Sequence, residues 1–276
     1  MSNNGKVTRS FYQVVMITTT LMTLFPLYFM VVNSLKTREQ YLNDPVGLPN
    51  PITFQNYVDA FKGKDIMAWF SNSIILTIGS VVVTMIIGIF AAYAFAKLKF
   101  KAKDVLFSFI VPMMSIPPVA MLIPLFKLVA ALGMVNTLTS VVIIYVGICL
   151  PMTVYMMRNF LLSVPDSIIE AAKMDGCSDF RILFDFILPL SIPAIITSGL
   201  VNFVWCWNEL MIALVFLQKD SLRTLMVGTT IFKSRYTLNV PVIMAGLVVV
   251  TIPVIIVYVL GQKQLVEGIT DGAVKE

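Results

Sequence analysis

The sequence predicts an all-α membrane protein with six transmembrane helices and short helices at its cytoplasmic surface. Of its 276 residues, 58% are hydrophobic and only 13% are charged, a composition that soluble globular domains do not have. A hydrocarbon core of about 30 Å needs about 20 apolar helical residues to cross it, and the chain contains six apolar runs of that length. These runs lie near residues 11–33, 71–96, 105–131, 138–159, 187–216 and 241–261.

The first apolar run is expected to remain in the protein as a span. Lys6 and Arg9 precede it, as basic residues also precede the core of a secretory signal. However, the apolar stretch from Phe11 to Val32 is longer than a signal core, and no small-residue cleavage site follows it.

The loop between the second and third runs predicts the orientation in the membrane. Four lysines lie within seven residues of this loop, namely Lys97, Lys99, Lys101 and Lys103. Short loops rich in lysine stay on the cytoplasmic side. With six spans, both termini and the segment 160–186 are then cytoplasmic as well. The net charge of +5 therefore reflects membrane orientation rather than nucleic-acid binding.

Prolines interrupt the third apolar run at four positions: Pro112, Pro117, Pro118 and Pro124. Each proline removes a backbone N–H donor and disturbs the helical hydrogen bonds around it. At membrane depth a broken helix is tolerated only where protein or a cavity satisfies the freed carbonyls. The third span is therefore expected to be interrupted, either as a wall of a solute pathway or as a kinked packing helix.

Small residues are scattered through the second apolar run, among them Gly79, Ser80 and Gly88. In a membrane, small side chains allow two helices to approach closely. The second span is therefore expected to pack against another span.

The residue types exclude several classes of chemistry. The chain has no histidine, three cysteines and no GxxxxGK(S/T) phosphate-binding motif, so no metal site, no cofactor and no nucleotide hydrolysis are expected. Cys149 and Cys206 lie in apolar runs and Cys177 lies in a loop, so no disulfide pair is expected. The chain is not expected to be an enzyme, and energy for its work must come from a partner.

A polar segment after the fourth run predicts two short helices joined by a bend. Pro165 suits the first turn of a helix, and Asp166 stabilises a helix N-terminus electrostatically. Gly176 is a natural stop after this helix. A second helix is expected to begin after Ser178 and to continue to Leu188.

The first of these short helices presents a surface suited to a partner protein. Ala171 and Ala172 leave little bulk beside the carboxylate of Glu170. Such a face fits a groove on another protein and can pair with a basic side chain there. The alternative is an interfacial helix whose acidic side chains are simply solvated.

The same segment resembles the cytoplasmic motif of permeases in ATP-binding-cassette (ABC) importers. The matching residues are Glu170, Ala171, Ala172, Gly176, Leu188 and Pro189, and Phe186 stands where isoleucine is usual. Other pieces are similar to the carbohydrate importers, and especially to the G-type permease subunits of maltose transporters. These pieces are FQNYVDAF, WFSNSIILT, RNFLLSVPDSIIEAAKMDG, WNELMIAL, LRTLMVG and QKQLVEGITDGAVK.

The resemblance implies a single permease domain over 1–276 that imports a carbohydrate, most simply an oligosaccharide, across the plasma membrane of a bacterium or archaeon. Residues 165–180 are then the segment coupled to the ATPase, with Glu170, Ala171, Ala172, Asp175 and Gly176 as its contact residues. The implied partners are a second permease subunit, two ATPase subunits and an extracytoplasmic sugar-binding protein.

Two further segments are expected to meet these partners. The outer segments 34–70 and 218–240 are candidates for docking the binding protein, although 34–70 also has the aromatic residues of a membrane-surface anchor. The tail 268–275 either reaches the ATPase interface or is a frayed end.

Aromatic and polar residues on the fifth span are candidates for the solute pathway: Trp205, Trp207, Asn208 and Glu209. An acid inside a membrane span suggests function, and sugars are held by aromatic faces with hydrogen-bonding groups. The alternative for the tryptophans is an anchoring role at the membrane interface.

Two other function classes compete with an ABC permease. A stand-alone ion-coupled secondary transporter usually has buried carboxylates or broken helices in two related halves. Here Glu209 is a single acid near a span end, and no second proline-rich half matches the third span. A membrane-embedded enzyme would need a metal cluster or paired intramembrane carboxylates, and the sequence offers neither.

Overall fold

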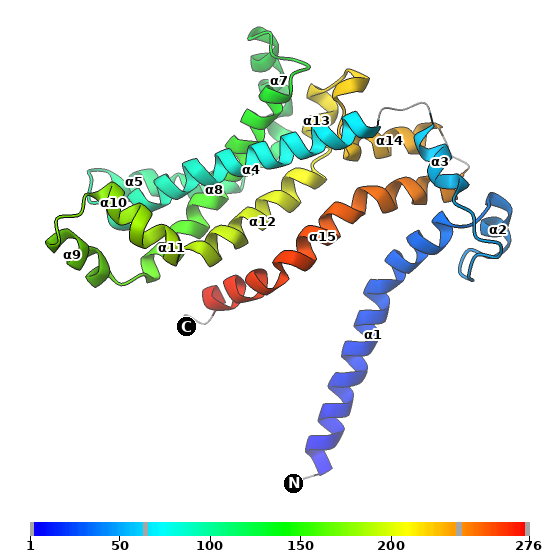
Figure 1. Cartoon of the computed structure of the whole chain (residues 1–276), viewed down its shortest axis with the longest axis horizontal. Coiled ribbons are helices and arrows are strands. Elements are labelled where there is room, and N and C mark those ends of the chain that lie inside the picture. The colour runs from blue at the N-terminus through cyan, green and yellow to red at the C-terminus, as the bar shows by residue number, and fades with distance from the viewer. Residues whose placement is uncertain (1–2, 63–65, 236–238, 274–276) are drawn as a thin grey trace. The chain divides into compact units, whose positions relative to one another are not determined.

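The computed structural model of the protein describes residues 3–62, 66–235 and 239–273, and the side chains within 9–62, 66–230 and 239–263. Its described part contains helices and no strand (Figure 1), which confirms the predicted all-α class.

The chain divides into two compact units, which are described separately. The first unit comprises residues 1–65 and 228–252, and the second comprises residues 66–227 and 253–276. Two helices have residues in both, namely α14 (Leu225–Arg235) and α15 (Val240–Ala273).

Four helices of the described part are long and apolar enough to cross a membrane, and the number is six if each of two bent helix pairs forms one span. The four continuous stretches are Arg9–Ser34 in α1, Ile66–Lys97 in α4, Leu138–Ser163 in α8 and Val240–Lys263 in α15. The two bent pairs are Lys103–Met114 with Pro118–Ala131, and Asp179–Leu190 with Ile192–Asn208.

The first bent pair confirms that prolines interrupt the third span. It consists of α5 (Lys103–Ser108), α6 (Ile110–Met114), η1 (Pro118–Met121) and α7 (Leu122–Ala131). The two halves meet at 97°. Pro117 is extended and Pro118 opens η1, since neither can donate the N–H that would continue the preceding helix.

The second bent pair differs from the continuous run expected over 187–216. The chain passes from α10 (Asp179–Ile182) through η2 (Leu183–Ile187) and α11 (Leu188–Leu190), bends by 76°, and continues as α12 (Ile192–Asn208). A further short helix, α13 (Met211–Phe216), is separate. Pro189 and Pro193 lie near the starts of α11 and α12, where a missing N–H costs least.

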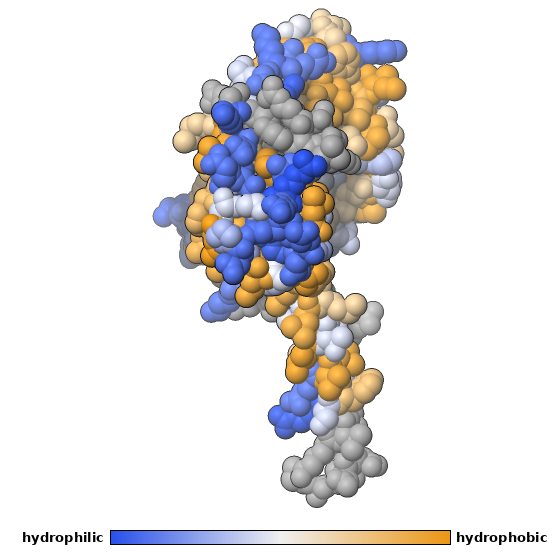
Figure 2. Space-filling model, turned by 90° about the vertical axis from the view of Figure 1, so that its right-hand side faces the viewer, coloured by the Kyte–Doolittle hydropathy of each residue, from blue (hydrophilic) through white to orange (hydrophobic). Residues whose placement is uncertain are grey.

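In the first unit, α1 (Asn3–Ser34) leads into two short helices, α2 (Arg38–Asn43) and α3 (Gln55–Phe61). The side chains described on α1 are exposed along most of its length, and Figure 2 shows mostly hydrophobic residues along this helix. Such a surface suits lipid or another apolar helix.

Buried polar groups hold the segment after α1 in place. The Asn56 side-chain amide donates to the carbonyls of Ser34 and Lys36, at 2.8 and 2.7 Å. The ammonium group of Lys36, although only 1% of this residue is exposed, donates to the Asp44 carbonyl at 2.7 Å. The backbone N–H groups of Gly47 and Val46 lower the pKa of the Asp44 carboxyl. This segment is therefore a folded block rather than an open loop.

The second unit is organised around α4 (Ile66–Lys97), which packs along α8 (Leu138–Ser163) (Figure 1). The buried stripe of α4 consists largely of small and hydroxyl residues, among them Ser73, Thr77, Ser80, Thr84 and Gly88. The backbone of α4 lies close to α8 at Gly88, where an added Cβ would be 2.6 Å from Cγ2 of Thr153. The predicted close packing of the second span is thus confirmed.

Two hydrophobic clusters fill the second unit. The first joins α4, α8, α12 and α13, with Tyr145, Cys206 and Phe216 among its buried members. The second joins the other ends of α4 and α8 to the polar segment that follows α8, with Met157 and Ile182 among its members. The short helices are therefore fixed to the spans by apolar packing.

Replacing Gly88 with alanine is expected to destabilise the fold by about 1–3 kcal/mol, because the added methyl overpacks the interface of α4 and α8. Thr153 cannot turn away, since its hydroxyl donates to the Cys149 carbonyl at 3.0 Å and accepts from Asn202 at 2.8 Å. Thermal unfolding of the purified chain in detergent measures the effect.

The control for this substitution is Gly79→Ala on the same helix. A Cβ at Gly79 lies 3.8 Å from its nearest neighbour, an ordinary contact, so the control should unfold at the temperature of the unmodified chain or above it. Equal unfolding temperatures for the two variants would contradict the close approach at Gly88.

Candidate coupling segment and solute pathway

The segment after α8 forms the two short helices that the sequence predicts. The first, α9 (Asp166–Met174), follows Pro165 and carries Asp166 in its first turn. Gly176 ends it with a φ of +76°, a conformation that suits glycine. The next helix, α10, begins after Ser178, whose hydroxyl accepts from the Arg181 N–H at 3.3 Å.

One edge of α9 is anchored in the second unit. Ile169 and Ala172 are buried in the hydrophobic cluster that includes Met157 of α8. The start of the helix is tied to the end of α4, because Lys97 donates to the Asp166 carboxylate at 2.6 Å and to the Val164 carbonyl at 2.7 Å. The hydrogen bond and charge of Lys97 lower the pKa of the Asp166 carboxyl, so this contact persists near neutral pH.

The opposite edge of α9 is exposed and contains most of the predicted coupling residues. Glu170, Ala171, Asp175 and Gly176 are all exposed. Ala172 is not, since it faces the core, so the two adjacent alanines do not form one open face. Successive side chains on a helix point about 100° apart, so Ala172 is buried in the core while Ala171 is exposed.

Met174 is a surface residue that the sequence interpretation did not single out. It is 90% exposed at the end of α9, one helical turn after Glu170, so the two side chains share a face. Met174 and Glu170 thus give this face one apolar and one charged side chain that a partner could contact. The sequence did contain a signal, because the helical spacing of Met174 places it on a different face from the buried residues Ile169 and Ala172.

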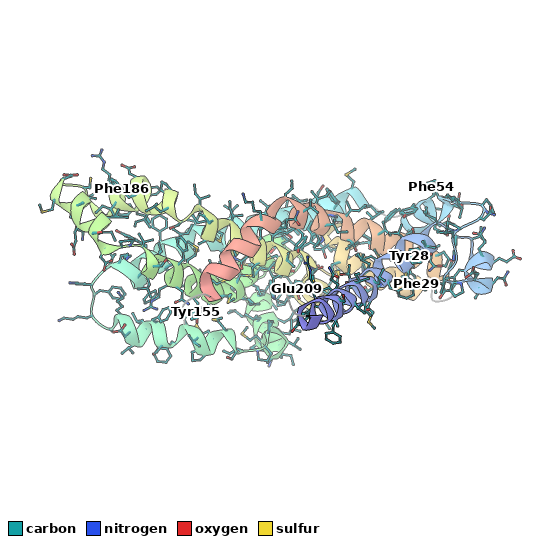
Figure 3. All side chains as sticks on the ribbon, turned by 90° about the horizontal axis from the view of Figure 1, so that it is seen from below. Tyr28, Phe29, Phe54, Tyr155, Phe186 and Glu209 are labelled. Atoms are coloured by element: carbon teal, nitrogen blue, oxygen red, sulfur yellow. The ribbon has the colours of Figure 1, made fainter. Side chains whose placement is uncertain are left out.

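The second half of the motif lies where the chain returns to the spans. Leu183 and Ile187 are buried in the same cluster as α9. Phe186, labelled in Figure 3, is 38% exposed and faces away from that cluster. Phe184 makes an edge contact with Phe90 of α4, with ring centroids 6.2 Å apart. Phenylalanine at 186 is therefore accommodated at the surface.

Glu209, the one acid predicted on the fifth span, holds the break between α12 and α13 (Figure 3). Its carboxylate accepts from the backbone N–H groups of Ile212 and Ala213, at 2.8 and 3.1 Å. It also accepts from the Tyr145 hydroxyl at 2.7 Å. These bonds satisfy N–H groups at the start of α13 that have no helical partner. Glu209 therefore has a structural role at this break.

The other pathway candidates separate into different environments. Trp205 is half-buried and makes an edge contact with Tyr145, with centroids 5.5 Å apart. Trp207 is buried and stacks on Phe203 at 5.8 Å. Asn208 is exposed, and its amide donates back to the Val204 carbonyl at 2.8 Å. Of these four candidates, Trp205 lines the cavity described next.

That cavity has a volume of about 530 Å³ and lies among α6, η1, α8 and α12. Its wall is largely apolar, with methionines from the broken third span, and no charged residue lines it among those described. Asn202 adds a buried amide that donates to the Thr153 hydroxyl at 2.8 Å. The sequence interpretation missed Asn202, although a polar amide in an apolar run was a visible signal.

Two of the three cysteines lie side by side. The Sγ atoms of Cys149 on α8 and Cys206 on α12 are 3.9 Å apart, and both thiols are free and buried. The expectation that no disulfide forms agrees with these free thiols, but the proximity was not foreseen. The predicted contact of the tail 268–275 lies beyond the described side chains.

Comparison with known proteins connects these features to transport. Residues 84–270 match the family described as "Binding-protein-dependent transport system inner membrane component". The sulfoquinovosyl glycerol transport system permease protein SmoH of Agrobacterium fabrum is 34% identical, over 91% of this chain and 89% of its own. The arabinooligosaccharides transport system permease protein AraQ of Bacillus subtilis is 31% identical, over 92% of each chain.

A solved structure has the same fold. It is a chain of a bacterial ABC transporter involved in the import of the acidic polysaccharide alginate, with a TM-score of 0.83, 27% identity, and coverage of 95% of this chain and 98% of that one. The family match spans well over half of the sequence. The protein described here therefore belongs to the family of inner membrane components of binding-protein-dependent transport systems, whose ATPase activity lies in separate subunits.

Proposed function

We propose that this chain is a membrane-spanning permease subunit of an ATP-driven importer for a carbohydrate, most simply an oligosaccharide. It lies in the plasma membrane of a bacterium or archaeon with both termini in the cytoplasm. The observation that supports the proposal most directly is α9: one edge is buried against α4 and α8, and the other edge exposes Glu170 and Met174.

This arrangement suits the transmission of motion. A partner that contacts Glu170 and Met174 applies force to a short helix that cannot move alone, because Ile169 and Ala172 lie in the core. The contact of Lys97 with Asp166 adds a second attachment at the start of the helix. Movement of α9 therefore moves the ends of α4 and α8, and the mechanical input reaches the spans.

The cavity of about 530 Å³ is the candidate for part of the solute pathway, and its lining residues would form the pathway wall. Trp205 presents an aromatic face there and Asn202 a buried amide, which are groups that suit a neutral sugar. Glu209 acts indirectly, because it binds Tyr145, and Tyr145 packs against Trp205. Two relatives are named as permease proteins of transport systems for sulfoquinovosyl glycerol (SmoH) and for arabinooligosaccharides (AraQ). These names support a carbohydrate as the solute.

The proposal requires a second permease subunit, two ATPase subunits and an extracytoplasmic sugar-binding protein. The outer segments 34–70 and 218–240 are the candidate docking surfaces for the binding protein. Purification of the chain from its native membrane in a mild detergent, followed by mass spectrometry, tests this assembly. Recovery of a Walker-motif ATPase and a second six-span protein supports it, whereas solute movement by the chain alone without ATP contradicts it.

Replacing Glu170 with lysine is expected to reduce the amount of ATPase that co-purifies by at least about tenfold, because reversing one charge of a buried interface pair costs several kcal/mol. Membrane insertion should not change, since Glu170 is exposed. Quantitative mass spectrometry of the purified complex measures the ratio of the two chains.

The matched control is Glu39→Lys, the same charge reversal at an exposed position on α2. It should leave the ATPase ratio unchanged. A normal ratio in Glu170→Lys, or an equal loss in both variants, would remove the coupling assignment of Glu170.

Substitutions at Gly176 test whether solute uptake depends on the backbone conformation of the bend after α9. Gly176→Val is expected to abolish uptake, because a β-branched residue at φ +76° is strained by about 1–3 kcal/mol. Gly176→Asn should retain most uptake, since asparagine tolerates this conformation. No atom lies within 4 Å of an added Cβ, so equal loss in both variants would instead indicate a side-chain clash with the partner.

Substitutions at Glu209 distinguish two roles for this residue: positioning Tyr145 and α13, or contacting the sugar directly. Glu209→Ala leaves the Tyr145 hydroxyl and two backbone N–H groups without their acceptor, and each such group costs about 1–3 kcal/mol when buried. We expect a lower unfolding temperature in detergent, with Glu209→Gln much closer to the unmodified chain. Unchanged stability in Glu209→Ala together with lost uptake would support a direct ligand role instead.

A further inference from the structure

A small basic cavity lies in the loop between α4 and α5, and its lining residues differ from those of the solute cavity. It has a volume of about 430 Å³ and is formed by residues between Leu98 and Val105. Lys99, Lys103, Phe100 and Asp104 line it. The chain turns sharply here because Ala102 adopts a left-handed conformation, with a φ of 62°.

The four lysines of this region have different roles. The Lys97 side chain is only 4% exposed and is bound to Asp166. Lys103 donates weakly to the carbonyls of Ala96 and Leu98, at 3.3 and 3.2 Å. Lys99 and Lys101 are exposed, and neither forms an ion pair with any residue that the structure describes. The loop therefore presents a positive charge that the described part of the chain does not neutralise.

An aromatic frame holds this loop against the spans. Phe95 lies 5.8 Å from Phe100 and 5.6 Å from Phe107, measured between ring centroids. The guanidinium of Arg158 lies 3.9 Å from the Phe107 centroid, and Tyr155, labelled in Figure 3, stacks on the same ring. The frame fixes the start of α5 beside α4 and α8, so the cavity is preformed.

The surface that continues from the cavity along α5 is apolar and exposed. Val105, Leu106 and Phe109 are each at least half exposed. Asp104 is the one acid among the residues that line the cavity, so lysines outnumber acids in the loop. A basic cavity joined to an apolar strip has the two chemistries of a phospholipid: an anionic headgroup and its acyl chains.

We propose that the loop 98–105 binds the headgroup of an anionic phospholipid. Its principal cationic contacts are Lys99, which lines the cavity, and Lys101, which is exposed on the same loop outside the cavity lining. The exposed apolar strip of Val105, Leu106 and Phe109 lies against the acyl chains. Lys103 contributes at the cavity wall, and Lys97 remains with Asp166. The start of the loop is also tied to α9, because Lys97 forms an ion pair with Asp166.

The test uses the full chain with the subunits that co-purify with it, reconstituted in nanodiscs of phosphatidylcholine with increasing phosphatidylglycerol of the same acyl chains. Native mass spectrometry measures the phosphatidylglycerol retained. Lys99→Gln combined with Lys101→Gln is expected to weaken retention about thirtyfold, as two lysines near an anionic surface would. Arginine at both positions should restore it, which also shows that the loop folds.

The control combines Lys127→Gln with Lys263→Gln, which removes the same charge from exposed positions outside this cavity. It should retain the lipid. Equal loss in the control would overturn the proposal in favour of general charge attraction, and displacement by millimolar inorganic phosphate would assign the site to free phosphate. Unchanged lipid retention with loss of the ATPase subunit would assign the lysines to a protein interface instead.

Discussion

The close packing of α4 against α8 is the constraint on which the rest of the second unit depends. Lipid supplies no hydrophobic force between helices, so association relies on shape and on a few polar contacts. Gly88 allows the approach, and Thr153 occupies the space that a side chain would need. With the two helices so placed, their ends form the surface on which Ile169 and Ala172 are buried. The position of α9, the proposed coupling segment, therefore depends on the packing of α4 against α8.

Features encoded by neighbouring residues were predictable from the sequence, and features that depend on helix pairing were not. The broken third span follows from its prolines, and the bend after α9 from Gly176, because both effects act on the local backbone. The role of Glu209 depends on Tyr145, 64 residues away. The contact of Cys149 with Cys206 likewise requires knowing which helices are neighbours.

The candidate site illustrates the same division. The position and length of α9 could be predicted, but the orientation of Ala171 and Ala172 could not, because both are small and either could face the core. Met174 and Asn202 were passed over for a related reason. An exposed apolar residue and a buried amide become informative only once the buried side of each helix is known.

The attachment of α9 has a consequence for how the transporter is built. The surface that carries Glu170 is assembled from parts distant in sequence, since Asp166 binds Lys97, 69 residues earlier, and Ala172 is buried in the same hydrophobic cluster as Ala92. In a nascent chain in which α4 and α8 have not yet packed, α9 therefore lacks the contacts that hold it in place. If α9 is the coupling segment proposed above, the ATPase subunits would therefore bind only a permease whose α4 and α8 are already packed.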